Sequence, residues 1–171
     1  MQKFWTYSIL FLLFILEGTV FQFLSVDYFY SLVTIVPHFV LVLIVFISIF
    51  QDRKKGLFIG LIFGFLYDVV YGKMIGINLM GMALVGYFSG WLTLYFQRSF
   101  PLYVMIETLT IFLFELYSFG TLRLFQLIDI SLKWAFIQVM IPTVIVNGIF
   151  AILIFKPFQF LIEEEMIEDK V

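Results

Sequence analysis

The sequence contains no cysteine, a single histidine and few charged residues. Without cysteine the chain has no disulfide, no thiolate metal ligand and no cysteine nucleophile. Charged residues make up only 13% of the chain, whereas a typical soluble domain has about a quarter. These shortages exclude a disulfide-rich secreted domain and a thiolate metal centre, and they argue against an ordinary soluble domain.

Hydrophobic residues take the place of the missing charges. They make up 63% of the chain, aromatic residues make up 21%, and the mean hydropathy is +1.10. A chain of 171 residues cannot bury this much apolar surface in a core of its own, so we expect lipid to be its solvent. The first apolar run continues past Glu17 without a small-residue cleavage site. We therefore interpret it as a retained span and not as a signal peptide.

Six apolar runs are long enough, or nearly so, to cross a bilayer as helices, each of which needs roughly 20 residues. The predicted spans are 4–24, 30–50, 56–72, 76–96, 101–124 and 134–155. The third is the shortest and would reach only about 25 Å, so we expect local bilayer thinning or a buried position for it. The sequence thus predicts an all-α membrane domain of six transmembrane helices over residues 1–155, followed by an acidic cytoplasmic tail, 156–171.

Lysine and arginine are distributed unevenly between the two ends of these spans. Placing the N-terminus inside puts seven basic residues on the cytoplasmic side, namely Lys3, Arg53, Lys54, Lys55, Arg98, Lys156 and Lys170. Three fall outside, namely Lys73, Arg123 and Lys133. Because cytoplasmic loops carry an excess of basic residues, we predict that both chain ends lie inside, the N-in/C-in orientation.

Glycines recur at steps of four in the third and fourth spans. They are Gly60, Gly64, Gly72 and Gly76 around the third span, and Gly86 and Gly90 in the fourth. Residues four apart share a helix face, and a G-x-x-x-G pair lets two helix backbones approach closely. We interpret these glycines as helix-packing residues that join the two spans as a hairpin, with docking of a partner helix as the alternative.

An aspartate, Asp68, interrupts this glycine face. A charge at mid-bilayer costs roughly 2.5–3.5 kcal/mol on insertion scales. We therefore expect Asp68 to face the bundle interior or the outer surface. Its small neighbours would let another backbone come close enough to donate hydrogen bonds to it.

Five polar residues are predicted to share a depth in the outer half of the membrane. They are Glu17, His38, Asp68, Asn78 and Glu115. They indicate either hydrogen bonds between helices or a polar cavity. Asn147 is expected to bond across helices. Pro37 and Pro142 each lack a backbone donor, so we expect them to kink the second and sixth spans and to free carbonyls that need new partners.

The sequence offers little support for catalysis. Asp68 with Glu17 or Glu115 as a carboxylate pair, or Ser89 with His38 as a serine protease, would be the candidates, and no motif supports either. A phosphate loop, a zinc-ligand spacing and a basic nucleic-acid face are all missing. We predict no catalytic residues, no metal and no cofactor, and we expect no nucleic-acid partner.

A longer pattern resembles a known family. The segment "PHFVLVLIVF", followed by "QDRKKGLFIGLIFGFLYDVVYGKMIGINLMGMALVGYFSGWL", is similar to the core of the MreD family of rod shape-determining proteins over residues 36–92. The resemblance implies a non-enzymatic scaffold in the bacterial inner membrane that helps to organise lateral peptidoglycan synthesis during cell elongation. It implies the transmembrane helix of MreC as partner and, indirectly, MreB, RodA and its transpeptidase. It also implies a fold like that of the substrate-binding subunits of energy-coupling-factor transporters.

Two alternatives stay open beside the scaffold. A vitamin-type substrate-binding subunit of a transporter would share the six-span outline and the outer polar cavity. Such subunits usually carry an alanine face on the first helix, and alanine occurs here only at Ala83, Ala135 and Ala151. A scaffold that also binds a lipid or a wall precursor in an outward cavity is the second alternative.

Overall fold

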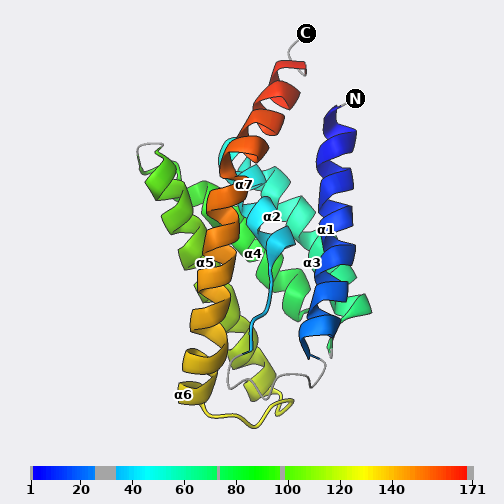
Figure 1. Ribbon diagram of the computed structural model, residues 1–171, viewed down its shortest axis with the longest axis vertical. Helices are drawn as coiled ribbons and strands as arrows, with labels where there is room; N and C mark the ends of the chain where they lie inside the picture. The colour runs from blue at the N-terminus through cyan, green and yellow to red at the C-terminus, as the bar shows by residue number, and fades with distance from the viewer. Residues whose placement is uncertain (1, 26–33, 73, 97–98, 169–171) are drawn as a thin grey trace.

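The computed structural model describes residues 2–25, 34–72, 74–96 and 99–168, and over these ranges the chain is helical without a strand. The elements are α1 (Gln2–Ser25), α2 (Phe39–Phe50), α3 (Arg53–Val70), α4 (Ile77–Leu92), α5 (Phe100–Leu124), α6 (Leu132–Ala135), the π-helical turn η1 (Phe136–Met140) and α7 (Ile141–Glu168). Since α6, η1 and α7 are continuous, the helices form six rods (Figure 1). The all-α prediction is confirmed for the described residues.

The rods alternate in direction. The first turn of α1 and the last turn of α7 therefore lie at the same end of the bundle (Figure 1). In the described part of the chain, two helices are long and apolar enough by themselves to cross a membrane, Phe100–Leu124 and Leu132–Glu164. Large apolar side chains also cover the outward faces of the shorter helices, for example Phe11 on α1, Phe58 on α3 and Phe88 on α4. A soluble monomer rarely exposes so much contiguous apolar surface.

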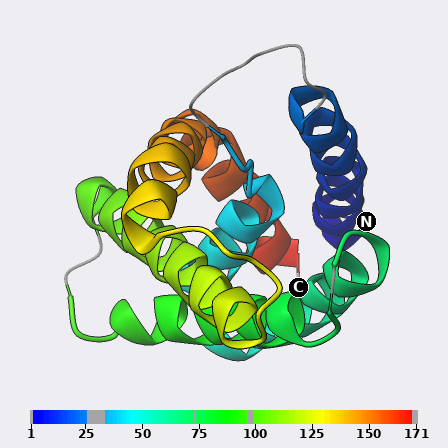
Figure 2. The same cartoon turned by 90° about the horizontal axis from the view of Figure 1, so that it is seen from below.

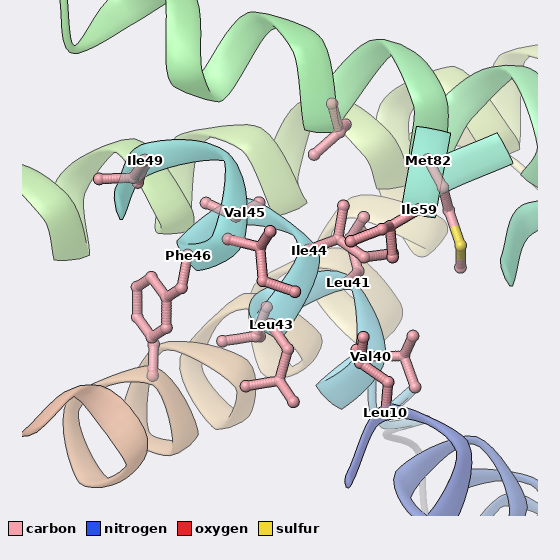
Figure 3. Packing of buried hydrophobic residues seen from close by; sticks show 14 of the residues in the cluster. Leu10, Val40, Leu41, Leu43, Ile44, Val45, Phe46, Ile49, Ile59 and Met82 are labelled. Carbon is pink, nitrogen blue, oxygen red and sulfur yellow. The ribbon is translucent and has the colours of Figure 1, made fainter. Parts of the chain in front are cut away.

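Helix α2 is the axis of the bundle. Every residue from Val40 to Ile49 is buried, and the helix contacts α1, α3, α4, α5 and α7. Its side chains point outward into these neighbours on all sides (Figure 3), and the Phe46 ring meets the Phe155 ring of α7 edge-on at 5.7 Å between centroids. A helix that is apolar all round is one that its neighbours enclose, and the all-apolar sequence of α2 agrees with this position.

The prediction of one helix over residues 30–50 is wrong at residues 34–38. Residues 34–38 carry no helix, and α2 begins only at Phe39; residues 30–33 lie outside the described residues. With 12 residues, α2 is about 18 Å long, which is well short of a membrane crossing. Pro37 therefore does not kink a helix. It lies in the irregular segment, because proline disfavours the helical conformation in the residue before it and has no N–H to donate to a preceding helical turn.

The α3–α4 hairpin uses its glycines for close internal packing. A Cβ atom on Gly60 would lie 2.5 Å from the Met82 carbonyl oxygen, and one on Gly64 would lie 2.5 Å from the carbonyl oxygen of Asn78. These contacts are with the backbone of α4, which cannot move away unless the two helices separate. The α3 face that carries these two glycines is thus occupied within the chain.

The remaining predicted glycines also pack inside the bundle or shape the hairpin turn. A Cβ on Gly86 would meet the backbone of Gly56, and one on Gly90 would meet Ser48 of α2. Gly72 lies one turn after Asp68, against its backbone, and Gly76 has a left-handed φ of 115° just before α4. Only glycine adopts that conformation without strain.

Candidate polar cavity

A cavity of about 350 Å³ lies at the end of the bundle where α1, α3 and α5 end and α4 begins. The loop between α5 and α6 crosses this end (Figure 2) and contributes Ile128 and Ile130 to the lining. Four of the five residues predicted to share a depth line the cavity, namely Glu17, His38, Asn78 and Glu115. The structure therefore brings together side chains from α1, α4, α5 and the segment before α2.

Three of these side chains form a buried cluster. His38 Nε2 lies 2.6 Å from Glu115 Oε1, and His38 Nδ1 lies 4.0 Å from Glu17 Oε1. The three residues are only 4–8% exposed. The imidazole thus links α1 to α5 through one hydrogen bond and one longer electrostatic contact. Phe114 stands edge-on to the imidazole, with the ring centroids 5.1 Å apart.

Glu17 also caps the start of α2. The backbone N–H of Val40 donates to Glu17 Oε2 at 3.2 Å. The first N–H groups of a helix have no partner within it, and a carboxylate placed there also complements the positive end of the helix dipole. A helix that starts inside the bundle needs such an acceptor, because hydrocarbon offers none.

The non-helical segment before α2 is held by the last rod. The Val36 N–H donates to Thr143 Oγ1 at 3.0 Å and the His38 N–H donates to Asn147 Oδ1 at 2.8 Å. The Asn147 amide in turn donates to the Val36 carbonyl at 3.1 Å. The prediction that Asn147 bonds across helices is confirmed. These contacts supply the backbone hydrogen bonds that the missing helix turns would have made.

The proline in the last rod, Pro142, frees a further acceptor for this segment. Proline has no N–H, so the Gln138 carbonyl, four residues earlier, lacks its α-helical donor. That carbonyl lies in η1 and accepts from the backbone N–H of Thr34 at 2.8 Å. A π-helical turn close before a proline marks an interruption of the helical hydrogen bonds, and the freed carbonyl binds the non-helical segment before α2.

Asp68 lies beside the cavity and is not one of its lining residues, which corrects the grouping of all five residues. Its carboxylate caps α4: Oδ2 accepts from the N–H groups of Gly76 at 2.7 Å and Leu79 at 2.9 Å, and Oδ1 accepts from the Asn78 N–H at 2.9 Å. The Asn78 amide adds a bond at 3.0 Å. The expectation that a nearby backbone donates to Asp68 is confirmed, and the donor is the start of its own hairpin partner.

Sequence reasoning missed part of the lining. Tyr67, Tyr71 and Ser118 line the cavity as well, and the buried Tyr67 hydroxyl lies beside the Glu17 carboxyl group without a hydrogen bond of normal geometry in the described part of the chain. The spacing of Tyr67 and Tyr71, one turn apart next to Asp68, is the signal that would have revealed them. Glu107 lies eight residues before Glu115, outside the cavity; it is fully buried, and its Oε1 has no partner among the described residues.

A helical bundle with an apolar outer surface, a short buried central helix and polar groups gathered inside is typical of an α-helical membrane protein. The family model described as rod shape-determining protein MreD matches residues 2–164. The chain belongs to this family, and the resemblance seen over residues 36–92 is confirmed. It is therefore a rod shape-determining membrane protein.

A curated relative agrees with this assignment. The chain is 28% identical over 123 residues to the rod shape-determining protein MreD of Bacillus subtilis (strain 168), covering 72% of each chain. No solved structure matches the chain.

Proposed function

We propose that this protein is a non-enzymatic scaffold of the bacterial cell-elongation machinery, located in the cytoplasmic membrane. In this role it binds the transmembrane helix of MreC, and through MreC it is linked to MreB, RodA and the RodA-associated transpeptidase, so that lateral peptidoglycan synthesis is organised. Membership of the MreD family is the observation that carries the proposal. The apolar outer surface supports it, because a partner helix in lipid docks by side-chain packing on such a surface.

The docking face is assigned to α1. The glycine faces of α3 and α4 are already filled within the chain, which argues against partner docking there. Helix α1 stands at the edge of the bundle (Figure 2) and carries a shallow apolar groove. The groove is lined by Tyr7, Ser8, Phe11, Leu12, Ile15 and Leu16. The small Ser8 between larger side chains gives a partner helix a place to approach closely.

The double variant Phe11→Ala/Leu12→Ala is expected to lower the amount of MreC that co-purifies with the protein by about fivefold, which corresponds to roughly 1 kcal/mol of lost packing. Both side chains are exposed, at 53% and 58%, so the fold is expected to persist. The measurement is quantitative immunoblotting of MreC after purification from membranes.

The matched control for this experiment is Phe58→Ala/Ile62→Ala on the exposed face of α3, where the side chains are 61% and 59% exposed. It is expected to leave MreC recovery unchanged. If both double variants lose MreC equally, or if neither does, α1 is not the docking face.

The proposed orientation has both ends in the cytoplasm. The start of α1 and the end of α7 lie at the same end of the bundle (Figure 1), which supports placing both on the same side of the membrane. The basic residues at 53–55 favour the cytoplasmic side. A fluorescent-protein fusion after residue 171 is therefore expected to fluoresce, and an alkaline-phosphatase fusion in the loop after residue 125 is expected to be active. The reverse pattern would overturn the orientation.

The vitamin-type transporter subunit is the runner-up. The cavity beside α1, α4 and α5 is the observation in its favour. Family membership favours the scaffold, and a fold like that of energy-coupling-factor subunits stays a proposal.

A further inference from the structure

We propose that the cavity is a binding site for a small amphipathic organic amine, whose ammonium group is held by Glu17 and Glu115 while its apolar body fills the remaining space. This inference does not depend on MreC binding, since it concerns an internal site. It rests on the size of the cavity, the chemistry of its two ends and one unsatisfied polar atom.

The volume is suited to a small organic molecule. About 350 Å³ lies near the lower end of the roughly 300–1,000 Å³ found for small-molecule sites. Most of the lining is apolar, from side chains such as Met82, Leu122 and Val139. An apolar wall with a few polar groups gathered at one side is the usual design of a site for an amphipathic ligand.

The charge of the polar side favours a cation. Two carboxyl groups, Glu17 and Glu115, flank one imidazole, and the described lining residues include no lysine or arginine. An anionic head group, such as a phosphate, would find no basic side chain except His38, which Glu115 already engages at 2.6 Å. An ammonium group would meet carboxyl oxygens, for which charge-assisted hydrogen bonds are strong.

Aromatic rings form part of the cavity lining. Tyr67, Tyr71, Phe114 and Phe119 all line the cavity. Aromatic faces attract organic cations through the ring quadrupole, and this attraction increases when water is excluded. The combination of carboxyl groups, aromatic rings and no fixed basic group selects an amine over a carboxylic acid of the same shape.

The Tyr67 hydroxyl is the unsatisfied atom. Tyr67 is only 8% exposed and lines the cavity, and its Oη lies beside the Glu17 carboxyl group without a hydrogen bond of normal geometry in the described part of the chain. A buried hydroxyl without a partner costs free energy. A bound ammonium group between Tyr67 and Glu17 would donate to this oxygen and so satisfy it as an acceptor.

The test uses the full chain in phosphatidylcholine nanodiscs and three probes with the same indole body. The probes are tryptamine, which carries an ammonium group, indole-3-propionic acid, which carries a carboxylate, and 3-ethylindole, which is neutral. Equilibrium dialysis against matched empty nanodiscs removes the contribution of partitioning into lipid. We expect saturable binding of tryptamine, at least about tenfold tighter than that of either other probe, as the loss of one charged contact implies.

Two variants examine the two ends of the site. Glu115→Gln is expected to weaken tryptamine binding at least about tenfold, and Ser118→Phe, which fills the cavity from α5, is expected to abolish it. Glu163→Gln replaces an exposed carboxylate far along α7 and is expected to leave binding unchanged. Unfolding temperatures identify any variant that fails to fold. The comparison of the three probes uses the unaltered protein and does not depend on the variants.

Three results would overturn the proposal. The first is no saturable binding of tryptamine to the unaltered protein. The second is equal binding of indole-3-propionic acid or 3-ethylindole. The third is tryptamine binding that persists in a folded Ser118→Phe variant, because the amine would then occupy lipid or another surface.

Discussion

Gly60→Leu is expected to reduce the yield of folded protein from membranes at least about tenfold, equivalent to 1.4 kcal/mol or more. A side chain at this position would have to begin 2.5 Å from the Met82 carbonyl oxygen and 2.9 Å from the Ala83 Cα. Both atoms belong to the α4 backbone, so α3 and α4 would have to separate. Overpacking of a closed core costs about 1–3 kcal/mol even where side chains can adjust. The measurement is size-exclusion chromatography and thermal unfolding in detergent.

The chain provides a matched control for this variant. Gly120 lies in α5, is exposed, and has nothing within 4 Å of an added Cβ. Gly120→Leu is therefore expected to leave the yield unchanged or to raise it slightly, because leucine favours the helix more than glycine does. Equal losses from the two variants would show that the α3–α4 contact is not what makes Gly60 sensitive.

Asp68→Leu is expected to destabilise the fold by about 3 kcal/mol or more, since each buried donor left without an acceptor costs about 1–3 kcal/mol. The substitution leaves the N–H groups of Gly76, Asn78 and Leu79 without acceptors at the start of α4. Asp68→Asn keeps one acceptor oxygen, so its stability is expected to lie between that of the unaltered protein and that of Asp68→Leu. Thermal unfolding of the purified variants measures the effect, and loss of rod shape in cells that depend on the variant is its expected consequence.

Asp129→Asn is the control for Asp68. Asp129 is exposed in the loop at the same end of the bundle, and its replacement is expected to change neither stability nor cell shape. A fully stable Asp68→Leu variant would contradict the capping role. A stable Asp68→Asn variant that nevertheless fails to maintain rod shape would show that the charge itself has a function beyond the cap.

Depth along each helix was readable from the sequence. The helical rise converts residue number into height, and this grouped Glu17, Asn78 and Glu115, which do line one cavity. His38 joins them from a segment that is not helical, so the rise along a helix does not explain its position. Rotation about each helix axis was not readable. It decides that His38 meets Glu115 and that Asp68 turns away from the cavity toward the start of α4.

The non-helical segment before α2 also depends on contacts that the sequence does not reveal. Pro37 signalled an interruption, but the length of the non-helical segment depends on acceptors and donors that come from elsewhere. Asn147, Thr143 and the Gln138 carbonyl hold residues 34–38 from more than a hundred residues away. Without these partners a helix would be more stable in lipid, because a helix forms its backbone hydrogen bonds within itself.

The sequence by itself determined the solvent, the helical class, the close approach of the glycine-bearing helices and the need of Asp68 for donors, because these follow from composition and from spacing along one helix. Only the tertiary structure decided that the glycine faces are used internally, that Glu17 caps a helix starting inside the bundle, and that a cavity remains between α1, α4 and α5. These features depend on which faces of the six rods meet, and that choice is made by packing all of them at once.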